Sequence, residues 1–230
     1  EIGVRLVGSE MCIRDRVCNQ HKFSDYADYL HENLPAQAEL DLQREKPLNP
    51  APLVSVAIAC SGASRAAVRS TLEALGKQTY ANFEVCVVSE LAQAGLTDYE
   101  GIPKFRLVLF NGTAHEQLKA AEKMLNGAYF LQLLPGDLPA PDALHMLVLQ
   151  THANPEAEVV FADEDSVIDG IRQNPIFKPD YGRDTLRSFN SIGRPMLVSK
   201  RVHTAVGGFR GSTPAELWAY CIDCASVAKQ

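Results

Sequence analysis

From residue 53 onward, short apolar runs alternate with segments of helical periodicity. The runs are continuous and rich in β-branched or aromatic residues, which is typical of strands buried on both faces of a parallel sheet. Five such runs occupy residues 53–59, 83–89, 105–110, 128–134 and 158–162. Helices are predicted after the capping residue Ser64, over 114–125, from Pro141 to Gln150 and around 216–227. The alternation predicts βαβ units and an open, mostly parallel, doubly wound α/β sheet.

The first 51 residues depart from this pattern. Residues 6–16, LVGSEMCIRDR, resemble one reading frame of a transposase sequencing adapter and contain no helical periodicity, cap or signal-peptide pattern. We therefore expect residues 1–16 to be an artefact. In residues 17–51, apolar positions at helical spacing predict a helix that ends near Pro35, and a charged, proline-rich linker follows. A single domain is expected over 52–230, truncated at its C-terminus.

Charge and cysteine content narrow the class of protein. A net charge of -6 without any cluster of Lys or Arg argues against nucleic acid as a partner. The apolar runs are far shorter than the ~20 residues of a transmembrane helix. With Cys12 set aside, an odd number of cysteines remains, scattered through apolar or helical contexts, so no disulfide framework is expected. Cys221 and Cys224 are interpreted as helix neighbours rather than a metal or redox site, and a cytoplasmic location is predicted.

Six phrases in a fixed order carry a family resemblance. They are PLVSVAIA (52–59), LGKQTYANFEVCVVSE (75–90), GAYFLQLLPGDLPAPDAL (127–144), FADED (161–165), FKPDY (177–181) and VGGFRG (206–211). In this order the chain resembles family 2 glycosyltransferases of the subgroup that builds bacterial surface polysaccharides such as O-antigen and rhamnose chains.

The resemblance implies a GT-A fold, a nucleotide-diphosphate sugar donor and a divalent cation, Mg²⁺ or Mn²⁺. It also implies a glycan or lipid-linked glycan acceptor and work at the cytoplasmic face of the membrane, where peripheral association is left open. A hard cation held by carboxylates neutralises the leaving diphosphate, and a further carboxylate deprotonates the acceptor hydroxyl.

Two of the positions that the family usually fills with carboxylates are expected to contribute to binding of the nucleotide-sugar donor. Glu90 matches the acid that reads the nucleotide base, with a solvated loop residue as the alternative. The metal motif aligns with residues 134–137, where Leu134 and Gly136 replace acids and Asp137 remains as the predicted metal ligand. A turn residue after Pro135 is the alternative for Asp137.

The position of the catalytic base is also altered. The family's acidic pair aligns with Thr213 and Pro214, so the expected base is absent. Glu216 is the next acid and the predicted substitute. Its alternative interpretation is a first-turn acid that the helix dipole favours.

The acidic cluster Asp163, Glu164 and Asp165 and the pair Lys178 and Asp180 are intact. Three adjacent acids repel one another unless water, a metal or a ligand hydroxyl is near. At the carboxyl end of a buried strand they are expected to face the cleft, so these five residues are predicted to bind substrate.

The resulting hypothesis is a glycosyltransferase that acts on a growing cell-surface glycan. A catalytically degenerate GT-A domain, acting as a binding or scaffold module in polysaccharide synthesis, is the alternative, because most expected carboxylates are missing. A nucleotidyltransferase-like or dinucleotide-binding protein is less favoured, since no glycine-rich loop follows the first strand.

Overall fold

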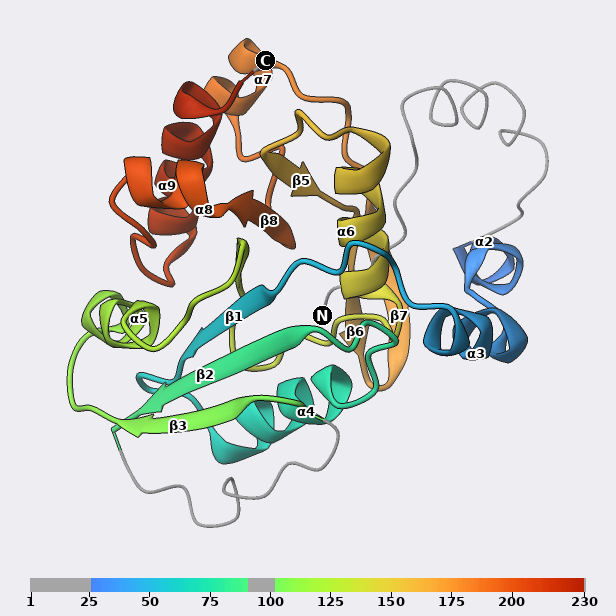
Figure 1. The fold of residues 1–230 in the computed structure, drawn as a ribbon, viewed down its shortest axis with the longest axis horizontal. Coiled ribbons are helices and arrows are strands. Elements are labelled where there is room, and N and C mark those ends of the chain that lie inside the picture. The colour runs from blue at the N-terminus through green and yellow to red at the C-terminus, as the bar shows by residue number, and fades with distance from the viewer. Residues whose placement is uncertain (1–25, 91–101, 230) are drawn as a thin grey trace.

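The computed structural model describes residues 26–90 and 102–229, and its centre is one six-stranded sheet. The strand order is β3-β2-β1-β4-β8-β5 (Figure 1). All neighbours pair in parallel except β8, which is antiparallel to both β4 and β5. The strands are β1 Val54–Ala59, β2 Phe83–Ser89, β3 Phe105–Leu109, β4 Tyr129–Gln132, β5 Val159–Phe161 and β8 Met196–Ser199. The predicted open, mostly parallel α/β sheet is confirmed.

Helices cover both faces of this sheet (Figure 1). On one face lie α4 (Arg65–Leu75) and α6 (Ala143–Ala153), whose leucines pack against one buried cluster. On the other lie α5 (Ala114–Glu122), α8 (Lys200–Ala205) and α9 (Pro214–Val227), which enclose a second cluster. The sheet is therefore doubly wound, as its apolar runs predict.

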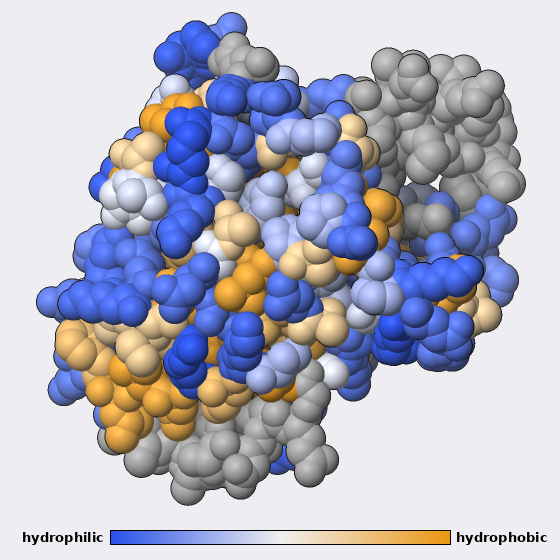
Figure 2. Space-filling view, in the orientation of Figure 1, coloured by the Kyte–Doolittle hydropathy of each residue, from blue (hydrophilic) through white to orange (hydrophobic). Residues whose placement is uncertain are grey.

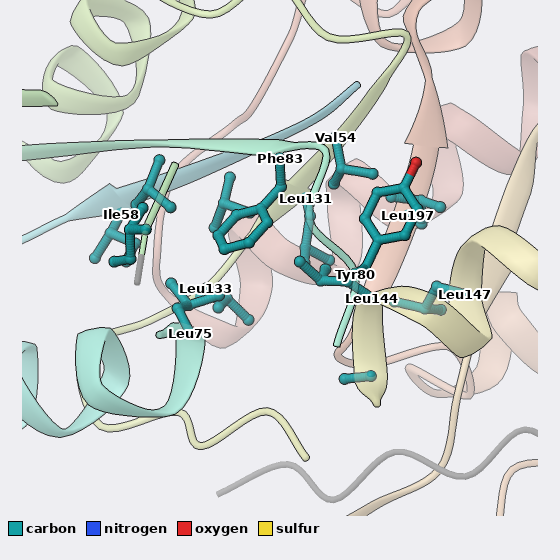
Figure 3. Close-up of a cluster of buried hydrophobic side chains, with 14 of the residues drawn as sticks. Val54, Ile58, Leu75, Tyr80, Phe83, Leu131, Leu133, Leu144, Leu147 and Leu197 are labelled. Carbon is teal, nitrogen blue, oxygen red and sulfur yellow. The ribbon is translucent and has the colours of Figure 1, made fainter. Parts of the chain in front are cut away.

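The central strand β1 shows why continuous apolar runs form this sheet. All six of its residues are buried. Val54 and Ile58 point into the cluster under α4 and α6, whereas Ala57 packs on the opposite side. Figure 3 shows the first of these clusters, where the ring of Phe83 lies beside Leu131. Each such side chain contributes roughly 1.5–3 kcal/mol through burial.

Several element boundaries differ from the predictions. The predicted helix 114–125 ends at Glu122 as α5. Pro141 lies before α6 rather than in its first turn, because Asp142 is the N-cap. The segment 192–198, which showed no regular pattern, overlaps β8, and the short helices α7 (Arg183–Ser188) and α8 were not predicted.

A small second sheet was also missed. It is a hairpin of β6 (Glu164–Ile168) and β7 (Ile171–Ile176), in which Ile168 pairs with Ile171. The two turn residues, Asp169 and Gly170, have φ values of 53° and 79°. Asp-Gly with two positive φ angles is a strong hairpin signal, and it is present in the sequence.

Between residue 26 and β1 the structure describes two helices, which lie at the right of Figure 1. The predicted helix before Pro35 is present as α2 (Tyr26–Asn33). The predicted linker, in contrast, contains a second helix, α3 (Gln37–Glu45). Its one buried residue is Leu40, and Gln43 Oε1 accepts a 2.7 Å hydrogen bond from Thr79 Oγ1. These tertiary contacts stabilise a helix that its charged sequence does not indicate.

The surface is mixed in character. Figure 2 shows hydrophobic residues gathered at the lower left, where β3 and α5 lie in Figure 1. Leu109, Phe110 and Met124 are the large exposed apolar side chains of that region. Within the described ranges, no helix has both the length and the hydrophobicity to span a bilayer.

Candidate functional site

The candidate site is the edge of the sheet at which the parallel strands end. In open α/β sheets ligands bind outside the carboxyl ends of the strands, because the loops there line a crevice. Here β1 is followed by the segment Cys60–Ser61–Gly62. Gly62 adopts a φ of +68°, and Ser64 then caps α4. Strands β2 and β4 end at the same edge, since both pair with β1 in parallel.

Glu90 lies at this edge, directly after β2. Its side chain is exposed, and its Oε1 accepts a hydrogen bond of 3.2 Å from Ser61 Oγ. The carboxylate of Glu90 therefore stands beside the loop after β1 with lone pairs left for a ligand donor. Its assignment as the residue that reads the nucleotide base stays a prediction.

The loop after β4 is a tight turn around Gly136. This glycine has a φ of +99°, and its N–H donates to Thr71 Oγ1 at 2.9 Å and to the carbonyl of Ala67 at 3.0 Å. Asp137 closes the turn, because its Oδ2 accepts from the N–H of Leu134 at 2.8 Å. Only 4% of Asp137 is exposed.

Asp137 forms an ion pair with Arg194, a residue that the sequence predictions did not include. Nη1 of Arg194 donates to Asp137 Oδ2 at 2.8 Å and to Oδ1 at 3.0 Å. Burial raises the pKa of Asp137, and the charge of Arg194 opposes this shift. Arg194 lies just before β8, whose amino end meets the carboxyl end of β4 because the two strands are antiparallel.

This pairing bears on the predicted metal site. Magnesium and manganese require one or more carboxylate oxygens that are free to coordinate. Both oxygens of Asp137 accept from Arg194, and among the described residues no group of three or more His, Cys, Asp or Glu is placed to hold a metal ion. Asp137 therefore does not fit the role of ligand to the expected cation, because Arg194 engages both its oxygens and its charge.

The acidic cluster 163–165 does not converge on one point. Asp165 Oδ2 accepts from Tyr26 Oη and from Arg172 Nε, each at 2.6 Å. Asp163 Oδ1 accepts from the N–H of Lys178 at 2.7 Å. Glu164 lies 3.5 Å from Lys178 Nζ. Lys178 thus serves both Asp163 and Glu164, whereas Tyr26 and Arg172 serve Asp165, and these intramolecular partners offset part of the expected repulsion.

Lys178 is a buried residue that supports Arg194. Its Nζ donates to the carbonyl of Arg194 at 2.7 Å. Burial lowers the pKa of Lys178, and the carboxylates of Glu164 and Asp163 act in the opposite direction. Asp180, the other predicted residue of this phrase, is exposed. Binding of substrate by these residues and by the acidic cluster stays a prediction.

Glu216 lies in the first turn of α9, where it completes a capping box with Thr213. Its Oε2 accepts from Thr213 Oγ1 at 2.7 Å, from Thr213 N at 3.0 Å and from Ser212 N at 3.1 Å. These hydrogen bonds, those of Thr213 first, lower the pKa of Glu216. A general base works best with a pKa near the working pH. The geometry therefore favours the helix-capping interpretation, and a catalytic role stays a prediction.

Gln132, at the end of β4, is another residue that the predictions did not include. Its Nε2 donates to the carbonyl of Gly211 at 2.7 Å, which ties β4 to the segment before α9. Its Oε1 is buried and has no hydrogen-bond partner among the described residues. A small pocket beside it is lined by Gln132, Gly193, Arg194, Met196, Leu217, Tyr220 and Cys221.

The sheet order, the antiparallel β8 and the helices on both faces define a GT-A-like fold. Two solved structures share it. TarS 1–349 from S. aureus in complex with UDP-GlcNAc superimposes with a TM-score of 0.56 at 16% identity, covering 74% of this chain and 52% of that one. The mannosyltransferase PcManGT from Pyrobaculum calidifontis, in complex with GDP-Man and Mn²⁺, has a TM-score of 0.53 at 17% identity, covering 84% of this chain and 59% of that one.

Two curated proteins are similar in sequence. The uncharacterized protein y4gI of Sinorhizobium fredii is 30% identical over 185 residues, which are 75% of this chain and 20% of that protein. The O-antigen biosynthesis protein RfbC of Myxococcus xanthus is 26% identical over 196 residues, or 81% of this chain and 15% of the relative. This chain therefore spans a fifth or less of the relatives it matches. No protein-family model matches the chain.

Proposed function

We propose that this chain is a glycosyltransferase domain that moves a sugar from a nucleotide-diphosphate donor to a cell-surface polysaccharide acceptor. The observation that carries the proposal is the GT-A-like sheet whose carboxyl edge presents Glu90, Ser61 and Arg194 together. Structures with this fold bind UDP-GlcNAc in one case and GDP-Man in another. The similarity to an O-antigen biosynthesis protein supports a surface glycan as the acceptor, and work at the cytoplasmic face of the membrane is part of the proposal.

In the proposed reaction the acceptor hydroxyl oxygen forms a bond to the anomeric carbon of the donor sugar. The bond between that carbon and the diphosphate oxygen breaks, and the nucleoside diphosphate leaves with the electron pair. The hydroxyl proton passes to a base. Positive charge near the diphosphate stabilises the leaving group, because negative charge develops there as the bond breaks.

A catalytically silent domain is the second candidate, and one observation favours it. Glu216, the acid nearest to the predicted position of the base, uses its carboxylate to cap α9. In this case the domain binds a nucleotide sugar or a glycan and serves as a scaffold for other parts of a larger protein.

A donor panel separates these candidates. The full chain is titrated with UDP-, GDP- and dTDP-sugars by calorimetry, with Mn²⁺ and with EDTA, and release of nucleoside diphosphate is followed in parallel. Binding of a nucleotide sugar, with release of the nucleoside diphosphate when a glycan acceptor is present, supports the transferase. Binding without release supports the silent domain. If no nucleotide sugar binds under either condition, the proposal that this is a donor-binding domain is wrong.

A further inference from the structure

Arg194 places a positive charge at the edge of the sheet where a metal ion was expected. The antiparallel register of β4 and β8 pairs Leu131 with Leu197, so the residues after β4 face those before β8. Arg194 and Asp137 are 57 positions apart in sequence and meet there at 2.8 Å. Both lie beside the tight turn at Gly136.

The guanidinium of Arg194 keeps hydrogen-bonding capacity after it has paired with Asp137. An arginine side chain carries about five N–H donors in a planar fork. Only Nη1 contacts Asp137, and across residues 26–90 and 102–229 neither Nε nor Nη2 has a protein acceptor. A quarter of the Arg194 side chain, 25%, is exposed. The remaining donors match the oxygens of a phosphate, which arginine binds in a bidentate manner.

The backbone of Arg194 is held rigidly in this position. The buried Lys178 donates from Nζ to the carbonyl of Arg194 at 2.7 Å. The preceding residue, Gly193, has a φ of +55°, and a Cβ there would lie 2.4 Å from Glu164 Oε1. No side chain fits at Gly193 without displacing the ion pair of Glu164 and Lys178. A cationic group fixed before the ligand arrives needs no reorganisation during the reaction.

A second observation in the same place also points to a ligand. The pocket that Arg194 lines is also lined by Gln132, which is 6% exposed and whose Oε1 has no hydrogen-bond partner in the described part of the chain. An acceptor left unpaired in a buried site costs free energy unless a donor reaches it. A ligand hydroxyl or a water molecule supplies such a donor. A phosphate for Arg194 and a hydroxyl for Gln132 are both present in a sugar diphosphate.

We infer that Arg194 takes the place of the divalent cation in this chain and binds the diphosphate of the nucleotide-sugar donor, so that donor binding needs no metal. This inference rests on the proposed function. Arginine stays protonated throughout, so Arg194 transfers no proton and acts only through its charge and its N–H groups. The ion pair with Asp137 orients the guanidinium, which makes Asp137 a positioning residue rather than a metal ligand.

The test is the affinity of the full chain for UDP, GDP and dTDP, measured by calorimetry in EDTA and in Mn²⁺. The expected result is a dissociation constant that changes by less than about twofold between the two conditions. The double variant Arg194→Gln/Asp137→Asn replaces the ion pair by a neutral pair of amides, in which glutamine is shorter than arginine. It is expected to weaken nucleotide binding by roughly 10- to 100-fold in EDTA, as for loss of hydrogen bonds to a charged group.

The single variant Asp137→Asn distinguishes arginine from metal. If Asp137 holds a cation, this variant loses binding in Mn²⁺. If Arg194 binds the diphosphate, the variant retains binding in both conditions, because the amide oxygen of asparagine can still accept from Nη1 and orient the guanidinium, whose charge is then no longer neutralised. Arg106→Gln is the matched control, because Arg106 also pairs with a buried carboxylate, that of Glu84, at 2.9 Å. This pair lies at the start of β2 and β3, at the opposite edge of the sheet from the candidate site. This control is expected to leave nucleotide affinity unchanged.

Circular dichroism and thermal unfolding establish that each variant is folded before its affinity is compared. Binding that requires Mn²⁺ and is lost in Asp137→Asn overturns the inference but leaves the proposed function intact. Unchanged affinity of the folded double variant overturns it as well. Failure of the unsubstituted chain to bind any nucleotide in either condition instead overturns the proposed function.

Discussion

Replacing Lys178 by methionine tests whether this buried lysine supports the site or binds substrate. The side chain of Lys178 is only 3% exposed, and it joins Glu164 to the carbonyl of Arg194. Methionine has a similar length and keeps the apolar packing, but it removes the charge and the hydrogen bond. The variant therefore separates the polar contribution of Lys178 from its volume.

The expected loss of stability follows from two contributions. A charge-assisted hydrogen bond contributes about 1.5–3 kcal/mol. Glu164, whose side chain is 19% exposed, also loses its cation, and the unpaired, partly buried carboxylate adds to the loss of stability. The cost of burying the lysine ammonium disappears in the variant, which offsets part of this loss. Together these effects predict a decrease of roughly 2–4 kcal/mol in the free energy of unfolding, which corresponds to about 4–16 °C in melting temperature for a chain of this size.

The assay is urea denaturation followed by circular dichroism, with nucleotide affinity measured on the same samples at a temperature at which both proteins are folded. The double variant Lys178→Met/Glu164→Gln is expected to recover part of the stability, because no uncompensated charge remains. Wild-type stability in Lys178→Met would refute the structural role. If nucleotide affinity fell at the same time, Lys178 would be a substrate-binding residue, as the sequence predicted.

Three further predictions concern carboxylates. Burial raises the pKa of Glu84, but hydrogen bonds from Asn126 N, Ser55 and Arg106 outweigh this effect and lower the pKa. The stability that ionised Glu84 contributes is therefore complete above the ordinary pKa of about 4.3 and is lost as the pH falls through the folded-state pKa. Urea midpoints measured from pH 7 down to pH 3 are expected to fall less steeply in Glu84→Gln than in the unsubstituted chain, and identical slopes would contradict this. Glu216→Ala is expected to cost about 1 kcal/mol by removing the capping box, with nucleotide affinity unchanged; full stability with loss of sugar transfer would instead mark a catalytic base. Glu90→Gln is expected to weaken nucleotide binding about fivefold in calorimetry, because a charged acceptor becomes neutral, and equal affinity would remove Glu90 from the site.

Strands β1 to β5 were predictable because each depends on a pattern within a few neighbouring residues. The run 83–89 coincides with β2, and the run 53–59 contains all of β1. Both are buried on both faces, so their apolar character is continuous and independent of register. The cap of α4 at Ser64 was predictable for the same reason, because capping is a local hydrogen bond.

Elements stabilised by distant contacts were harder to predict. Helix α3 has a charged sequence and depends on Leu40 and on the hydrogen bond of Gln43 to Thr79. The hairpin of β6 and β7 carries a clear Asp169-Gly170 signal, but its strands lack the regular alternation of a half-buried pair. In both cases the information lies outside the apolar periodicity on which the predictions relied.

For the site, the sequence alone determined which carboxylates are present and which are missing, because these follow from the order of the motifs. It did not determine what each remaining acid does. Only the tertiary structure pairs Asp137 with Arg194 across 57 residues and brings Lys178 to Asp163 and Glu164, and Tyr26 and Arg172 to Asp165. The physical reason is that the role of a carboxylate depends on the charges and donors within about 4–6 Å, and the fold, rather than the neighbouring sequence, brings those groups together.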